Sequence, residues 1–304
     1  MAARKPKPEP TLFCTAAPPF NKAAADLVLR SSDNVDFHVR RAILAEASPV
    51  FEDMLSLPQP PSASSSSAAG SPVVALTEPA RTLDALLRLC YPIADPPLAS
   101  PEDVCNTLEA ARKYLMDGPA HTLAAHFAAH AARDPLHLYA LACARGWAPE
   151  MRVAARASLA HPLPDGRTLP STPHLDTLSA SAYLRLQAYH RACRRVAVAL
   201  HCYGAPPGAA QRVYFARRAR KDAGHLAPWC GEYVERAREA LALRPCGATV
   251  LAPELAHAFL VEAGAKLPLH ERTRMLFDLV HFNAEYAQSV DRAVDEVQLE
   301  VYIP

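Results

Sequence analysis

The stretch that decides the fold covers residues 26–51 and reads D-L-V-L-R-S-S-D-N-V-D-F-H-V-R-R-A-I-L-A-E-A-S-P-V-F. Two β-prone runs, D-L-V-L-R and V-D-F-H-V, flank the turn-forming cluster S-S-D-N and predict a hairpin. The apolar spacing then becomes helical, with Ile43 and Leu44 on one face. Ser48 and Pro49 supply a side-chain cap and a first-turn proline for a second short helix. The stretch therefore predicts one hairpin followed by two helices.

Six apolar residues of the second strand and the two helices have the spacing to form one core. They are Phe37, Ile43, Leu44, Val50, Phe51 and Met54. Each would contribute about 1.5 to 3 kcal/mol if fully buried.

Further elements complete an N-terminal domain. Residues 58–72 form a low-complexity loop rich in Pro and Ser, and residues 73–76 could add a third strand. A Leu-rich helix follows, and Ser100-Pro101 opens another capped helix, which Gly118-Pro119 closes. Residues 23–118 are therefore predicted to form an α+β domain with a short β-sheet and a helical cluster.

The flanking regions differ from this domain in composition. Residues 1–22 contain five prolines among short polar residues, which favours a flexible tail. Residues 119–304 show helical spacing, and prolines after Asp134, Ala148 and Ala252 mark three helix starts. We therefore expect an all-α C-terminal domain.

Composition favours a protein of the cell interior. The chain has 304 residues, half of them apolar, and its net charge of +1 offers no overall attraction to nucleic acid or an anionic membrane. Its eight cysteines include no C-x-x-C pair, which favours a reducing compartment. No apolar run approaches the roughly 18 residues of a membrane span, and the N-terminus lacks the apolar core of a signal peptide. We expect an intracellular protein, in the cytoplasm or the nucleus, without membrane contact.

Catalytic motifs are missing from the sequence. It contains no G-x-S-x-G, H-E-x-x-H, G-x-x-x-x-G-K or G-x-G-x-x-G, and only 10 glycines. Nucleophile elbows and phosphate-binding loops are thereby excluded. We expect no enzymatic activity, no catalytic residue and no cofactor.

A zinc site is the sharpest alternative to a purely structural C-terminal region. Six residues have suitable side chains: His190, Cys193, His201, Cys202, Cys230 and Cys246. Along a straight helix, however, residues 190 and 201 would lie roughly 16 Å apart, whereas zinc binds its ligands at about 2 to 2.3 Å. We therefore predict no metal site, with Cys193 in the core and His190 partly exposed.

A basic segment is the one candidate for nucleic-acid binding. Its basic and aromatic residues are Arg212, Tyr214, Phe215, Arg217, Arg218, Arg220 and Lys221. Residues 185–244 carry twelve basic and four acidic side chains, whereas residues 271–304 carry three basic and seven acidic ones. The basic surface is therefore better explained as facing this acidic region or solvent, and we predict no nucleic-acid binding.

The C-terminus shows a heptad-like pattern that predicts a long amphipathic helix. The positions are Leu276, Val280, Asn283, Ala287, Val290, Val294, Val297 and Val301. The pattern fits either a helix docked on its own domain or a coiled coil between two copies, and the small Ala287 favours docking.

The N-terminal motifs together carry a family resemblance. Asp26 begins the first strand, Phe37 lies on the second, and R-R-A-I-L-A-E-A-S-P-V-F follows; later helices end at Cys90-Tyr91 and Lys113-Tyr114. This pattern, over residues 23–118, resembles a BTB/POZ domain. Within the family it looks most similar to the fungal, basidiomycete-type group with a helical C-terminal region.

The resemblance implies a non-catalytic scaffold or adaptor that binds other proteins, including a second copy of itself. In the family, an acidic residue of the first strand and a basic residue of the first helix form a charged pair in a pocket at the dimer surface. The matching positions here are Asp26 and Arg41. Members that dimerise by exchanging an N-terminal strand and helix have those elements where this chain has its Pro-rich tail.

The resemblance also leaves two alternatives open. Cullin-binding members present a hydrophobic-x-acid motif before the third strand, where this chain has the Ser-rich loop; Leu76-Thr77-Glu78 imitates that motif after the strand. A substrate-recruiting adaptor of a cullin-type ubiquitin ligase is the first alternative. A transcription-related regulator that uses the basic segment is the second.

Overall fold

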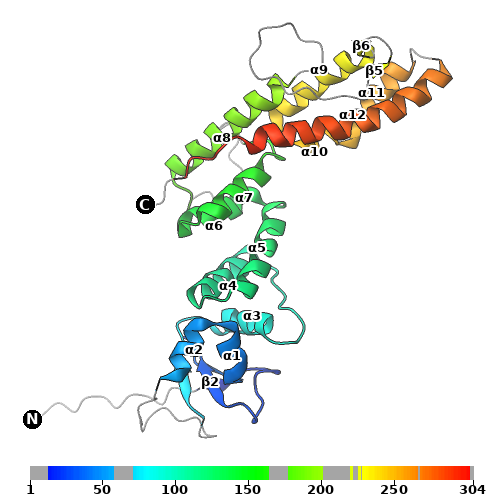
Figure 1. Cartoon of the computed structure of the whole chain (residues 1–304). Helices are drawn as coiled ribbons and strands as arrows, with labels where there is room; N and C mark the ends of the chain where they lie inside the picture. The colour runs from blue at the N-terminus through cyan, green and yellow to red at the C-terminus, as the bar shows by residue number, and fades with distance from the viewer. Residues whose placement is uncertain are drawn as a thin grey trace, which may run out of the picture. The chain divides into compact units, whose positions relative to one another are not determined.

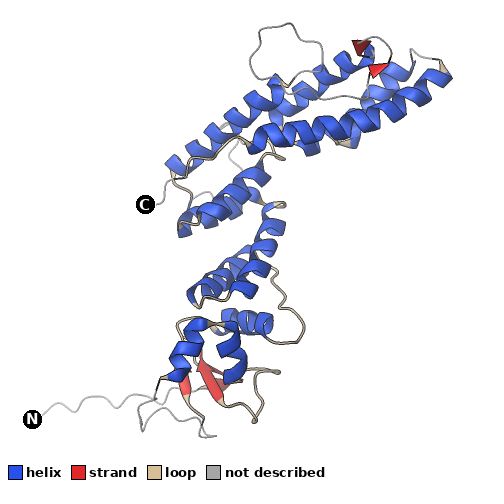
Figure 2. Cartoon of the chain, in the orientation of Figure 1, coloured by secondary structure: helices blue, strands red, loops and turns tan. Residues whose placement is uncertain are grey.

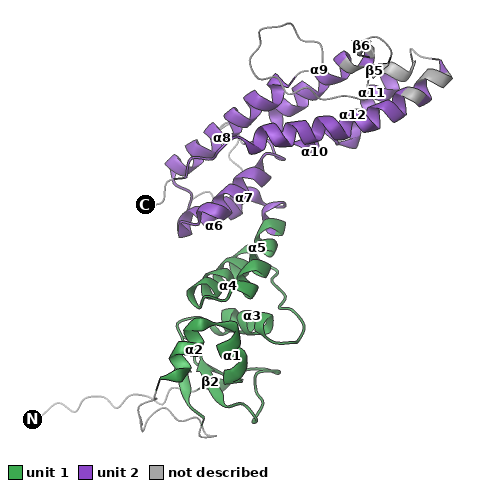
Figure 3. Ribbon diagram, in the orientation of Figure 1, with its two compact units in different colours: residues 1–129 green, residues 130–304 purple. Residues whose placement is uncertain are grey.

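The computed structural model describes residues 13–57, 71–163, 177–200, 220–221, 225–226, 228–265 and 268–301. Four strands form one sheet near the N-terminus (Figure 1), and helices make up most of the remainder (Figure 2). The chain divides into two compact units, residues 1–129 and 130–304 (Figure 3). The predicted fold class is confirmed. The domain boundary expected after residue 118 stays a prediction.

The sheet of the first unit is built around the predicted hairpin. Its strands are β1 (Cys14–Thr15), β2 (Leu27–Arg30), β3 (Val35–Val39) and β4 (Val73–Ala75). Their order is β1-β3-β2-β4, with β2 and β3 antiparallel and Leu29 opposite Phe37. The outer strands run parallel to their neighbours. The hairpin and the third strand expected near residues 73–76 are both confirmed.

The expectation of an unpacked tail through residue 22 is wrong for residues 13–22. The Cys14 N–H donates to the Asn34 carbonyl at 3.0 Å, which adds β1 to the sheet. Phe20 is 1% exposed, and its ring centroid lies 6.0 Å from that of Phe37 and 5.3 Å from that of Tyr91. The buried aromatic ring and the backbone pairing outweigh the extended preference of the surrounding prolines. Residues 1–12 lie outside the described residues.

The helices of the first unit follow the predicted caps. They are α1 (Arg41–Ala47), α2 (Pro49–Ser56), α3 (Ala80–Cys90), α4 (Pro101–Lys113) and α5 (Asp117–Ala131). The Ser48 hydroxyl accepts the Phe51 N–H, and the Ser100 hydroxyl accepts the Asp103 N–H, each at 3.1 Å. Gly118-Pro119, expected to close a helix, instead lies in the first turn of α5.

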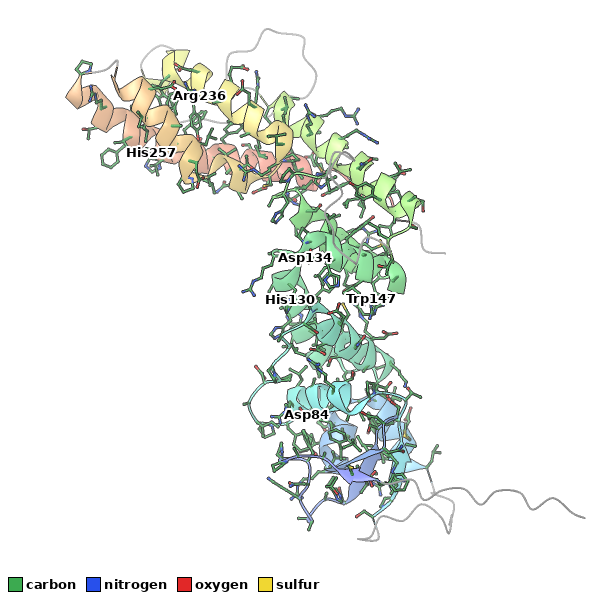
Figure 4. All side chains as sticks on the ribbon, turned by 180° about the vertical axis from the view of Figure 1, so that it is seen from behind. Asp84, His130, Asp134, Trp147, Arg236 and His257 are labelled. Carbon is green, nitrogen blue, oxygen red and sulfur yellow. The ribbon has the colours of Figure 1, made fainter. Side chains whose placement is uncertain are left out.

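The second unit is helical. Its helices are α6 (Pro135–Arg145), α7 (Ala148–Ser158), α8 (Ala180–Ala199), α9 (Pro228–Leu243), α10 (Gly247–Val250), α11 (Pro253–Ala265) and α12 (Leu269–Asp295). The three helix starts predicted from prolines are confirmed. Asp134 caps α6, and Gly146, with φ 68°, ends it just before Trp147 (Figure 4). A two-residue antiparallel ladder, β5 (Arg220–Lys221) with β6 (His225–Leu226), adds to the helices. Among the described helices, none is long and apolar enough to cross a bilayer.

The C-terminal helix α12 buries only part of the predicted heptad pattern. Helix α12 packs against α8 and α10, and four heptad positions in its C-terminal half are buried: Asn283, Ala287, Val290 and Val294. Leu276 and Val280 are 46% and 63% exposed, because the buried face in that half is carried by Met275 and Leu279. The straight helix drifts away from a strict seven-residue repeat, so one stripe cannot stay buried along its length. Docking is confirmed for the C-terminal half, and Val297 and Val301 lie beyond the helix end.

Candidate functional site

Helices α1 and α2 cover the sheet with only part of their apolar surface. Phe37, Leu44 and Phe51 are at most 2% exposed, and Phe51 stacks on Tyr114 with 4.8 Å between ring centroids. The other three predicted core residues are only half-buried: Ile43, Val50 and Met54. Leu57, directly after α2, is 65% exposed. The α1–α2 face, defined by Ile43, Val50, Met54 and Leu57, is therefore an apolar surface that the described residues of the first unit leave partly open.

Asp26 and Arg41 meet beside this face, but not as a pair of charged side chains. A carboxylate oxygen of Asp26 accepts the backbone N–H of Arg41 at 2.8 Å. The Arg41 guanidinium instead donates to the Leu55 carbonyl at 2.5 Å. No salt bridge joins the two side chains, both of which lie in the described part of the unit.

Helix ends explain this arrangement. The Arg41 N–H is one of the unpaired donors at the start of α1, where the helix dipole favours an anion. The Leu55 carbonyl is one of the unpaired acceptors at the end of α2, where a cation is favoured. Each charge therefore stabilises a helix terminus, and the exposed Asp26 carboxylate stays at the surface.

A buried acidic residue near β4 forms a hydrogen-bond network that motif reading alone did not anticipate. Glu78 is 9% exposed; its carboxylate accepts from Lys113 Nζ and from the Tyr114 hydroxyl, each at 2.6 Å. Burial alone would raise the pKa of Glu78, but the hydrogen bonds from Lys113 and Tyr114 and the Lys113 charge hold it below its usual value. The backbone carbonyl of Tyr114 in turn accepts a hydrogen bond from the Ser48 hydroxyl at 2.5 Å. The acid of Leu76-Thr77-Glu78 thus joins β4 to α4 and the α2 cap.

The first unit has a definite order of elements. A hairpin is followed by α1 and α2, a strand parallel to β2, and the helices α3 and α4. Residues 19–131 match the model of the BTB/POZ domain. BTB/POZ domains are generally protein-interaction modules, typically without catalytic activity. No curated protein matches the chain. The similarity to a fungal group of BTB/POZ proteins stays a prediction.

Outside the BTB/POZ domain, the structure revises the expectation for His190. Its ring is 8% exposed, not partly exposed as expected, and Nε2 lies 2.7 Å from the Ser158 hydroxyl oxygen. Burial lowers the pKa of His190 to about 4 and raises that of Cys193, which is fully buried, to about 11. In the described residues, no cluster of three His, Cys, Asp or Glu side chains could hold a metal ion.

Of the remaining zinc candidates, the structure describes only the side chain of Cys246. Cys246 is buried, with its sulfur 3.4 Å from the Thr249 hydroxyl oxygen. His201, Cys202 and the side chain of Cys230 lie outside the described residues.

The basic segment proposed for nucleic-acid binding lies mostly outside the described residues as well. Only the backbone of Arg220 and Lys221, in β5, is described. The acidic side chains of α12 have a different partner: Arg156 of α7 donates to Asp291 at 2.8 Å and to Asp295 at 3.0 Å. Asp291 and Asp295 of α12 therefore neutralise Arg156 of α7. In the described residues, no ion pair joins α12 to the arginines of α8.

Proposed function

We propose that this protein is an intracellular, non-catalytic interaction scaffold whose BTB/POZ domain binds a second copy of the chain. The α1–α2 face carries the proposal: Ile43, Val50 and Met54 are half-buried, and Leu57 is 65% exposed. Apolar surface left at the edge of a core gains free energy when a partner covers it. The exposed Asp26 carboxylate beside this face adds a charge that can fix the orientation of the partner.

Light scattering on the full chain tests self-association through this face. We expect a dimer, and Leu57→Asp should weaken it about tenfold or more, because a carboxylate would be desolvated in the interface. Val261→Asp is the matched control, since Val261 is 59% exposed but lies on α11 in the other unit. A dimer lost only with Val261→Asp would place self-association in the helical unit. A monomer at all concentrations would rule out the second copy.

In the same experiment, Asp26→Asn separates the effect of the Asp26 charge on the dimer from the effect of its hydrogen bond to the start of α1. Asparagine also caps helix starts well, so the hydrogen bond to the Arg41 N–H can persist and the fold should change little. If the carboxylate contributes to the dimer, the variant should shift the mass toward monomer with an unchanged circular dichroism spectrum. An unaltered dimer would remove Asp26 from the interface.

The cullin-adaptor alternative makes a different prediction. BTB/POZ domains include cullin-binding members, but the acid of Leu76-Thr77-Glu78 is held by Lys113 and Tyr114. Releasing Glu78 would leave the buried Tyr114 hydroxyl without its acceptor and Lys113 without its ion pair, which is costly. We therefore expect calorimetric titration with a cullin N-terminal domain to detect no binding at tens of micromolar protein. Saturable binding would establish the adaptor function instead.

A further inference from the structure

One face of α8 lines a cavity of about 320 Å³ in the second unit. Gln187, His190, Arg191 and Arg194 face it at successive helical turns, a spacing that places them on one side of the helix. The opposite wall is apolar and includes Leu163 and, at the end of α9, Leu243. The cavity thus combines two guanidinium groups with an apolar wall.

The arginines of this cavity carry charge that the described residues do not neutralise. Arg191 and Arg194 are exposed, and neither has an ion pair or a side-chain hydrogen bond within the described part of the chain. Two acidic residues of α12, Asp291 and Asp295, pair with Arg156. Two unpaired guanidinium groups, three residues apart on a helix, repel each other and favour an anion between them.

His190 forms a polar but uncharged part of the lining. The His190 residue is 8% exposed, and its Nε2 lies 2.7 Å from the Ser158 hydroxyl oxygen. Burial lowers the pKa of His190 to about 4, so the ring is neutral at physiological pH. The positive charge at the cavity therefore comes from the arginines and does not change between pH 6 and 8.

The apolar part of the cavity restricts the kind of anion. Leu243 is 66% exposed, and the wall that it belongs to also includes Pro162, Leu163 and Pro245. Such side chains favour a ligand with an apolar group beside its negative charge. The described lining holds no Trp, Tyr or Phe on which a nucleic-acid base could stack. A peptide with a carboxylate next to a large apolar side chain fits both features.

We propose that this cavity binds an acidic-apolar peptide segment of a partner protein. A Glu or Asp carboxylate of the segment accepts hydrogen bonds from Arg191 and Arg194, and a neighbouring Leu-type side chain covers Leu243. The inference rests on the proposed scaffold function, because it supplies a second binding surface distinct from the α1–α2 face.

Fluorescence anisotropy with the full chain tests the proposal. The probe is a labelled, capped peptide of repeated Glu-Glu-Leu units, and its controls are the Glu-Glu-Ser and Gln-Gln-Leu versions. We expect binding of the first peptide only. The double change Arg191→Ala/Arg194→Ala should weaken it about tenfold or more, as loss of charge-assisted hydrogen bonds predicts. Leu243→Ser should also weaken binding, and because Leu243 is 66% exposed, the change should leave the fold intact.

Arg195→Ala is the matched control, because Arg195 is exposed on the same helix but does not line the cavity. Equal weakening by Arg195→Ala, or equal binding of the Glu-Glu-Ser peptide, would mean diffuse electrostatic attraction and overturn the proposal. Binding of an oligouridine probe in preference to the peptide would overturn it in favour of nucleic acid. Leu57→Asp should lose the dimer and still bind the peptide. A dimeric chain that does not bind the peptide would overturn the cavity proposal alone, and a monomeric chain that binds it would overturn the proposed BTB/POZ contact alone.

Discussion

Replacing Gly247 with alanine is expected to destabilise the C-terminal unit by about 3 kcal/mol, because a Cβ at this position has no room. It would lie 2.6 Å from the Ala287 carbonyl oxygen of α12 and would also clash with the Asp291 carboxylate. Asp291 could rotate away, but only by giving up its hydrogen bonds to the Gly247 N–H and to Arg156, both 2.8 Å. The carbonyl belongs to the α12 backbone, so relief there requires the two helices to separate.

Denaturant unfolding followed by tryptophan fluorescence measures this effect in the right unit. The two tryptophans, Trp147 and Trp229, both lie in the second unit. Gly231→Ala is the control: nothing lies within 4 Å of a Cβ there, and alanine in a helix is favoured over glycine by up to about 1 kcal/mol. A loss below about 0.5 kcal/mol for Gly247→Ala would contradict the close approach of α10 and α12.

Local signals made much of the first unit predictable from sequence. The hairpin needs only two β-prone runs around S-S-D-N, and its strands pair as expected. Ser48 and Ser100 cap their helices because a serine before a first-turn proline satisfies the same backbone donors in most contexts. These features depend on residues close together in the sequence, so a single sequence is enough to predict them.

Tertiary contacts account for what the sequence did not predict. Phe20 is buried by Phe37 and Tyr91, neither of which is near it in sequence, so a Pro-rich composition hid an ordered segment. The Arg41 guanidinium donates to the Leu55 carbonyl at the end of α2, a contact that residue spacing in the sequence does not display. Both faces of α12 carry apolar residues, so periodicity alone could not show that Leu276 and Val280 face outward.

Removing the Glu78 side chain is expected to cost the BTB/POZ domain about 2 to 3 kcal/mol in the Glu78→Ala variant. The change leaves the buried Tyr114 hydroxyl without its acceptor and Lys113 without its ion pair. The lysine side chain is 46% exposed, so water offsets part of its loss. Hydrogen exchange of the α4 amides in the full chain measures the effect, and Glu46→Ala, an exposed position on α1, is the control.

The pH dependence of the free energy of unfolding separates the contribution of the Glu78 charge from that of its hydrogen bonds. The pKa of Glu78 is lower in the folded state, so the ion pair contributes fully above its unfolded pKa of about 4.3 and is lost as pH falls through the folded value. Glu78→Gln keeps an acceptor for Tyr114 but cannot ionise. The free energy of unfolding of the wild type should therefore exceed that of Glu78→Gln by a constant amount above about pH 5.5. This difference should become smaller in more acidic buffer. A gap that does not change with pH would mean that hydrogen bonding alone, without the Lys113 charge, holds β4 to α4.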